Sequence, residues 1–244
     1  MNLRSHGFLP HSRANGPGPR AVIWVQGCSL GCPGCFNPET HSLDGGEVVA
    51  VDDLFQRIIA LGDSIEGLTI SGGEPLQQRA AVTELLRRLK SETNLSVVLF
   101  TGFTWEEVTK MGAMECRSDE VSGWGATERQ GVKLSPSGDE MRRNVSRAAA
   151  LPCSHALPFP DTPTLQHSNT PPLPAFLNHV DVLIAGRYDA SRRLASGLRG
   201  SANKTMHFLT DRYGESDFRH LPEAEIVIQA DGSLVLSGIG LLEI

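Results

Sequence analysis

The fold and the chemistry that we expect of this chain depend on one stretch, Gly27-Cys28-Ser29-Leu30-Gly31-Cys32-Pro33-Gly34-Cys35-Phe36-Asn37. Its cysteines follow a C-x3-C-x2-C spacing and come directly after the apolar run 21–25. A short glycine-containing loop that leaves a strand can bring its thiolates to one point. A four-iron cluster usually takes one thiolate more than this loop supplies, so one iron would stay open to a ligand that is not protein. The stretch therefore predicts a reactive iron–sulfur site.

Short apolar runs alternate with amphipathic segments around this loop. We expect strands at 20–26, 67–70, 95–100 and 180–185, a helix capped by Asp52, a helix at 77–90 and a third that starts at Thr104. Such alternation predicts βαβ units and a mostly parallel sheet in an α/β fold. Ligands bind such sheets beyond the carboxyl ends of the strands. The cysteine loop and the segments 71–75 and 101–102 all follow strands, so we expect them at one shared edge.

The two ends of the chain are expected to differ in order. Residues 1–19 are polar and rich in Gly and Pro, which predicts an irregular lead-in. The apolar runs 225–229 and 233–236 flank Asp231-Gly232, a dipeptide typical of tight hairpin turns. We therefore predict a terminal β-hairpin.

A central segment interrupts the alternating pattern. Seven of the fifteen prolines lie within 152–174, and no apolar period is sustained from 113 to 174. Loops of this length are uncommon inside a compact domain. We expect 1–112 and 175–244 to be two halves of one domain, with 113–174 as a mobile, Pro-rich insertion.

Composition narrows the class of protein. The 244 residues are 40% apolar, and no run approaches the roughly 18–20 apolar residues that span a bilayer. The first residues lack the apolar core of a signal peptide. The formal net charge of −6 offers no basic surface for nucleic acid. Five cysteines, three of them within eight residues, are a poor disulfide framework. We expect a cytoplasmic protein that binds neither membrane nor nucleic acid.

A second motif, Ser71-Gly72-Gly73-Glu74-Pro75, follows the second predicted strand. With both motifs the chain resembles the radical S-adenosylmethionine (SAM) enzymes, and residues 27–40 more closely resemble the family of anaerobic ribonucleoside-triphosphate reductase activating proteins. The resemblance covers roughly residues 15–112 and 176–240. The resemblance implies a partial (β/α) barrel, a 4Fe-4S cluster on Cys28, Cys32 and Cys35, and SAM bound at the open iron.

The resemblance also implies an activity and partners. Members of this family reductively cleave SAM to a 5′-deoxyadenosyl radical, which installs a glycyl radical on a partner enzyme such as anaerobic ribonucleotide reductase. An electron donor such as a flavodoxin or ferredoxin would be required. Cofactors carry out the difficult chemistry in such enzymes, and the protein orients them.

Further site residues follow from the same resemblance. Backbone carbonyls at Ser71, Gly72 and Gly73, together with the Glu74 carboxylate, suit the SAM ammonium group. The aromatic that often precedes the third cysteine in the family is replaced here by Gly34. The other candidate SAM contacts are Phe36 against adenine, Asn37 as a polar anchor and Thr101 near the ribose.

Two departures from the family pattern concern the substrate side, and two other functions stay open. Lys204 stands where the family pattern has glutamine, and Ala185 where an aspartate often occurs. The first alternative is a radical SAM enzyme that acts on a small metabolite. The second is a non-catalytic iron–sulfur module, or a Cys3His zinc module with His41 as fourth ligand.

Overall fold

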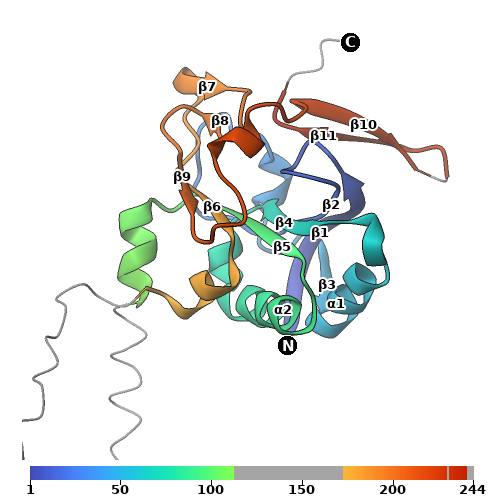
Figure 1. Cartoon of the computed structure of the whole chain (residues 1–244). Helices are drawn as coiled ribbons and strands as arrows, with labels where there is room; N and C mark the ends of the chain where they lie inside the picture. The colour runs from blue at the N-terminus through green and yellow to red at the C-terminus, as the bar shows by residue number, and fades with distance from the viewer. Residues whose placement is uncertain (113–172, 230, 241–244) are drawn as a thin grey trace, which may run out of the picture.

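The computed structural model describes residues 1–112, 173–229 and 231–240. A seven-stranded sheet lies at its centre, in the order β3-β1-β2-β4-β5-β6-β9 (Figure 1). Its strands are β1 (Asn2–Ser12), β2 (Arg20–Val25), β3 (Glu47–Ala50), β4 (Gly67–Gly72), β5 (Ser96–Thr101), β6 (Val182–Ala185) and β9 (Thr205–Phe208). The central strands β2, β4, β5 and β6 are mutually parallel, whereas β1, β3 and β9 pair antiparallel with their neighbours.

The predicted α/β architecture with parallel strands at its centre is confirmed. The sheet is open, because β3 and β9 are its two edges. No pairing between these edge strands closes a barrel within the residues that the structure describes.

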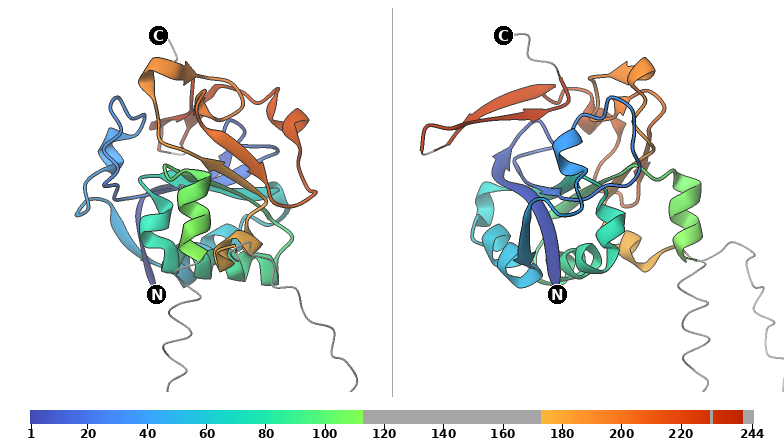
Figure 2. Two further views of the ribbon diagram at one scale, coloured as in Figure 1. Left: turned by 90° about the vertical axis from the view of Figure 1, so that its left-hand side faces the viewer. Right: turned by 180° about the vertical axis from the view of Figure 1, so that it is seen from behind.

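One face of the sheet packs on helices and the other carries a pocket. Helices α1 (Val51–Ile59) and α2 (Arg79–Glu92) cover the first face (Figure 2). Since side chains alternate along a strand, Ile23, Ile70 and Leu99 join the apolar core under these helices. Their neighbours on β2, β4 and β5 line the pocket on the opposite face. These neighbours are Trp24, Ser71 and Phe100.

The expectation of an irregular lead-in at 1–19 is wrong. Strand β1 pairs with β2 on one side and with β3 on the other. Its register shifts between Ser5 and Gly7 and again between Leu9 and Ser12. Such bulges insert extra residues into a strand, so the period-2 pattern that marks strands in a sequence is broken here.

The helix ends differ in part from the prediction. Helix α1 starts after Ala50, so Asp52 lies within its first turn rather than capping it, and it pairs instead with Arg88 of α2 at 2.7 Å. The predicted start at Thr104 is confirmed for the helical segment 105–112. The Thr104 amide donates to Glu107 Oε2 at 2.8 Å, and the Glu107 amide donates to Thr104 Oγ1 at 3.3 Å. The two bonds form a capping box.

The C-terminal part adds two small antiparallel sheets. One pairs β7 (Arg193–Leu194) with β8 (Gly200–Ser201), and the other pairs β10 (Ala224–Ile228) with β11 (Leu234–Gly238), which confirms the terminal hairpin. The 3-10 helices are η1 (Pro38–Thr40), η2 (Gly62–Ser64), η3 (Pro75–Gln78), η4 (Ala175–His179), η5 (Ala190–Arg192) and η6 (Glu215–Phe218).

Two further expectations concern the central insertion and membrane-spanning segments. The predicted insertion 113–174 lies outside the described residues except for its last two positions. Across the described ranges, no helix has the length and apolar character needed to cross a membrane.

Candidate active site

The two sequence motifs meet through their backbones at the carboxyl ends of β2 and β4. The Gly73 amide donates to the Val25 carbonyl at 2.7 Å, and the Glu74 amide donates to the Gly27 carbonyl at 2.9 Å. Gly72 has a φ of +98°, and a Cβ there would lie 2.6 Å from the Val25 nitrogen. Only glycine fits so close to a neighbouring backbone, so the residue type at Gly72 allows the second motif to dock under the cysteine loop.

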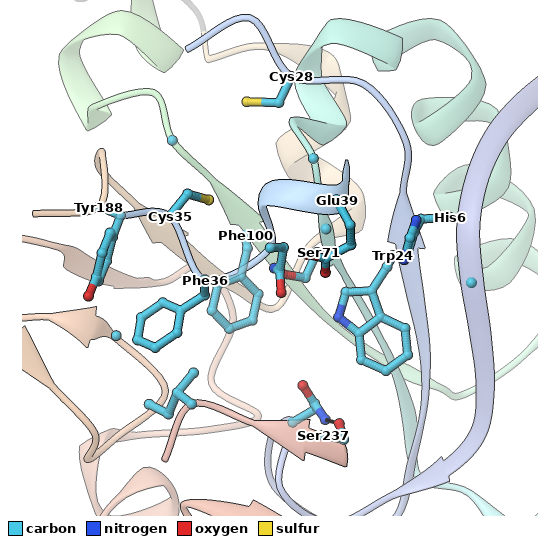
Figure 3. A pocket seen from close by; sticks show the side chains of 18 of the residues that line it. His6, Trp24, Cys28, Cys35, Phe36, Glu39, Ser71, Phe100, Tyr188 and Ser237 are labelled. Carbon is cyan, nitrogen blue, oxygen red and sulfur yellow. Dashed lines mark hydrogen bonds between the residues drawn. The ribbon is translucent and has the colours of Figure 1, made fainter. Parts of the chain in front are cut away.

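A pocket of about 390 Å³ opens beside this junction, on the sheet face opposite the helices (Figure 3). Its volume lies in the range of about 300–1,000 Å³ typical of small-molecule sites. The pocket collects every residue predicted to bind the cluster or SAM. These residues are Cys28, Cys32, Cys35, Phe36, Asn37, Ser71, Gly72, Gly73, Glu74 and Thr101. The structure brings them together, and their individual roles stay predictions.

The charge balance around the thiols fits a bound cation. Burial raises the pKa of the Cys28 thiol, and the nearby negative charges of Glu74, Cys35 and Cys32 raise it further. Three thiolates so placed are unfavourable together unless positive charge lies between them. An iron–sulfur cluster supplies that charge through direct iron–sulfur bonds.

The arrangement of the thiols fits a single metal ion less well. No three His, Cys, Asp or Glu side chains converge closely enough for one ion among the described residues. In Figure 3 the Cys28 and Cys35 thiols lie at separate points around the pocket. His41 lines the same pocket and accepts the Cys28 amide through its carbonyl at 3.2 Å, while its buried Nε2 has no hydrogen-bond partner in the described part of the chain. A zinc site would therefore require at least some of these ligands to move closer to one another.

The Glu74 side chain is fully buried and links the segment that follows β4 to the end of β5. Its Oε1 accepts hydrogen bonds from the Leu76 amide at 2.9 Å and the Thr101 hydroxyl at 2.8 Å, and its Oε2 accepts one from the Gly102 amide at 2.7 Å. Burial raises the pKa of this carboxyl, while the three hydrogen bonds and the charge of Lys204 oppose that change. A carboxylate has about four acceptor positions, so about one remains for a ligand.

The other predicted SAM contacts differ in how free their polar groups are. The Thr101 hydroxyl donates to Glu74 and accepts from the Phe103 amide at 3.1 Å, so it is already engaged. Ser71 Oγ forms no hydrogen bond with any described residue. The Asn37 carbonyl accepts from the Thr40 hydroxyl at 2.7 Å, which places Asn37 at the start of η1. The Ser71 hydroxyl is therefore more available to a ligand than the Thr101 hydroxyl.

Phe36 joins the cysteine loop to the C-terminal part of the chain. Its ring centroid lies 4.6 Å from that of Tyr188, and the Arg193 guanidinium lies 4.5 Å from its centre. Gly200 has a φ of +72°, and a Cβ there would lie 3.1 Å from the Phe36 ring. The segment 198–204 thus closes the pocket against Phe36.

Sequence reasoning did not predict a site role for Lys204. Its side chain lines the pocket, with Nζ 5.9 Å from the centre of the Phe100 ring. Burial lowers the pKa of Lys204, while the negative charges of Cys32, Cys35 and Glu74 raise it. Its ammonium has no hydrogen-bond or ion-pair partner among the residues described. The only sequence signal was the departure from glutamine at this position, and only the fold shows that the cation enters the pocket.

Comparison with known proteins places the cysteine loop in a recognised family. A family profile described as a 4Fe-4S single cluster domain matches residues 14–121. The anaerobic ribonucleoside-triphosphate reductase-activating protein of Vibrio cholerae is 36% identical over 113 residues, which cover 43% of this chain and 72% of that protein.

Two further relatives carry related names. A putative glycyl-radical enzyme activating enzyme of Haemophilus influenzae is 34% identical, over 36% of this chain and 34% of that protein. The pyruvate formate-lyase-activating enzyme of Clostridium pasteurianum is 29% identical, over 44% of this chain and 48% of that protein. A crystal structure of QueE from Escherichia coli aligns with a TM-score of 0.35 and 20% identity over 43% of this chain and 54% of that one, which is too distant to support an argument.

Proposed function

Because this chain belongs to the radical SAM enzymes that activate glycyl-radical enzymes, we propose that it installs a glycyl radical on a partner of the anaerobic ribonucleoside-triphosphate reductase type. When bound, the 4Fe-4S cluster and SAM supply reductive cleavage of the SAM C5′–S bond. A flavodoxin or ferredoxin as electron donor completes the proposal. We interpret the open sheet as the partial (β/α) barrel of this superfamily.

One observation carries this proposal: the cysteine loop and the second motif are hydrogen-bonded to each other and line one pocket. In this pocket, Cys28, Cys32 and Cys35 would hold the cluster. Three protein ligands leave a fourth iron position for SAM. The cysteines line this pocket, on the face of the sheet that the helices leave uncovered.

The pocket offers complementary groups for the two charges of an amino acid. The Gly73 carbonyl accepts no hydrogen bond from the described residues, and Glu74 keeps about one acceptor position, so both can receive the SAM ammonium group. The Lys204 ammonium, which also lines the pocket, can pair with the SAM carboxylate. These contacts orient SAM toward the cluster, and Phe36 and Phe100 keep water from one wall.

Anaerobic reconstitution tests the cluster assignment. We expect about four irons per chain, and complete loss of the thiolate-to-iron absorption in Cys28→Ala, Cys32→Ala and Cys35→Ala. Cys116→Ala and Cys153→Ala are the matched controls and should keep the absorption. A protein that takes up stoichiometric zinc and refuses iron would contradict the assignment.

The partner assignment needs a separate experiment. The reconstituted protein, SAM and dithionite are mixed with the anaerobic ribonucleoside-triphosphate reductase encoded in the same genome, and the glycyl radical is measured by electron paramagnetic resonance. We expect a radical that depends on all components. SAM cleavage that proceeds with a free metabolite, but leaves no radical on the reductase, favours the metabolite alternative.

A further inference from the structure

The terminal hairpin presents an exposed apolar face. In its register Ile226 pairs with Leu236, and Ile228 with Leu234, so the four side chains lie on one face of the two strands. Their exposed fractions are 53%, 57%, 73% and 68% in that order. We call this set (Ile226, Ile228, Leu234 and Leu236) the hairpin patch. Contiguous exposed apolar surface of this kind marks interaction sites more often than isolated apolar residues do.

The opposite face of the hairpin is attached to the body of the protein. Glu225 accepts hydrogen bonds from the Ser12 hydroxyl and, at 2.9 Å, from the Arg13 amide. On β11, Ser237 is buried and accepts a hydrogen bond from the Asn15 side chain. The hairpin is therefore held in one orientation while it projects from the rest of the fold, as Figure 1 and the right-hand view of Figure 2 show.

The hairpin patch borders the pocket at one of its residues. Leu236 belongs to the patch and also lines the pocket, together with its neighbours Val235 and Ser237. Ser237 lies across the pocket from Phe36 and the Cys35 loop in Figure 3. A ligand that extends out of the pocket on this side therefore meets the hairpin.

We propose that the hairpin patch docks the glycine-bearing segment of the partner enzyme, with that segment extended and apolar side chains directed onto the patch. The inference rests on the proposed function, because it assumes a polypeptide substrate. A hydrogen atom on a backbone Cα reaches a pocket only if the chain that carries it enters too. Side chains alternate along an extended segment, so such a segment can direct its apolar side chains onto one face of the hairpin.

The chemistry of the patch determines what kind of segment fits. The outward face of the two strands carries no charged residue. Its residues are Ala224, Ile226, Ile228, Leu234, Leu236 and Gly238. Recognition there rests on apolar contact rather than on ion pairs, so the flanks of the partner's glycine should be uncharged and apolar.

A second copy of this chain is a less suitable occupant. Stable interfaces between copies involve about 20–30 residues on each side, far more than the four side chains of the patch. A partner segment that contacts the patch and continues into the pocket gains the additional contacts that the patch alone lacks.

Photo-crosslinking tests the occupant directly. Ile228→p-benzoylphenylalanine is compared with Val48→p-benzoylphenylalanine, because Val48 is 52% exposed on the edge strand β3. Both proteins are expressed in anaerobic cells and the products are identified by mass spectrometry. We expect position 228 to crosslink to the glycine-bearing segment of a glycyl-radical enzyme. A crosslink to a second copy, or a yield no higher than at position 48, would overturn the proposal.

A double variant gives the energetic test. Ile228→Ser with Leu234→Ser should raise the partner concentration needed for half-maximal glycyl radical formation about tenfold, as expected for loss of an interface hot spot. SAM cleavage without partner should be unchanged, and Val48→Ser is the control. Normal cleavage with unchanged partner dependence in the double variant contradicts the docking proposal alone. Absence of SAM cleavage in the unsubstituted holoenzyme contradicts the proposed function instead.

Discussion

The amino and carboxyl ends of the parallel strands differ in how many hydrogen-bond partners surround a buried charged side chain. At the amino ends, the fully buried Arg20 guanidinium donates to Thr69 Oγ1 at 2.9 Å, the Pro17 carbonyl at 2.6 Å and Ser96 Oγ at 3.1 Å. At the carboxyl ends, the Lys204 ammonium lines the pocket and has no such partner in the described part of the chain.

Asp181, next to the amino end of β6, is a second buried charge that is surrounded by polar partners. It is almost fully buried and binds Lys90 Nζ at 2.6 Å, the Val97 amide at 2.7 Å and the Thr210 hydroxyl at 2.8 Å. Burying a charge is costly unless polar partners surround it. The charges at the amino ends therefore hold strands together, whereas at the carboxyl ends the Lys204 ammonium and about one acceptor position of Glu74 stay available to a ligand.

The largest effect that we expect comes from breaking the amino end. Arg20→Met leaves several buried acceptors without a donor, so the free energy of unfolding should fall by about 3–5 kcal/mol. Urea denaturation followed by circular dichroism measures it. The matched control, Arg87→Met, removes an exposed arginine whose ion-pair partner among the described residues is Glu84, and should change the midpoint little. Equal midpoints for both variants would show that the Arg20 bonds do not support the sheet.

The next effect concerns Glu74 at the carboxyl end. Glu74→Gln removes the charge and places an amide nitrogen where an acceptor is needed, so SAM affinity should fall about 10- to 100-fold. Iron content should stay normal, because Glu74 is not a cluster ligand. Thr101→Val removes one bond to Glu74 without changing its charge. If calorimetry shows that the two variants lose equal SAM affinity, Glu74 supports the pocket through its hydrogen bonds and does not contact SAM itself.

A smaller effect is expected at Lys204. Lys204→Gln restores the residue of the family pattern and removes one charge-assisted contact, so SAM should bind about tenfold more weakly. The free energy of unfolding should not fall, because the ammonium has no partner within the described residues. S-adenosyl analogues without the carboxylate should bind both proteins equally. Two results would contradict the pairing of Lys204 with the SAM carboxylate. One is a variant that unfolds more easily, and the other is a variant that prefers SAM over the analogue by the same factor as the parent does.

The smallest effect is a pH dependence at Asp181. Burial raises the pKa of this carboxyl, but hydrogen bonds from Lys90, Val97 and Thr210 outweigh burial and hold the pKa below its usual value. The unfolded chain then binds more protons at acid pH. The contribution of Asp181 is complete above the ordinary aspartate pKa of about 4 and is lost as pH falls through the lower folded value. Asp181→Asn should flatten the fall in urea midpoint between pH 5 and pH 3, and an unchanged slope would contradict this.

The central elements were predictable because their signals are local. The cysteine spacing, the Ser71–Glu74 motif and the apolar runs of β2, β4, β5 and β6 are each contained in a few neighbouring residues. The terminal hairpin followed from apolar runs on either side of a turn dipeptide. β1 was missed because two bulges interrupt its alternation, and its pairing with β2 and β3 is a property of distant segments.

By itself, the sequence determined the cysteine loop, the second motif, the alternation of strands and helices, and the family. Only the tertiary structure decided that Glu74 is already held by Leu76, Thr101 and Gly102, that Lys204 enters the pocket, and that the hairpin patch reaches it through Leu236. The physical reason is sequence separation. Whether a charge or an apolar face is satisfied depends on which remote groups surround it, and those neighbours exist only after the sheet has formed.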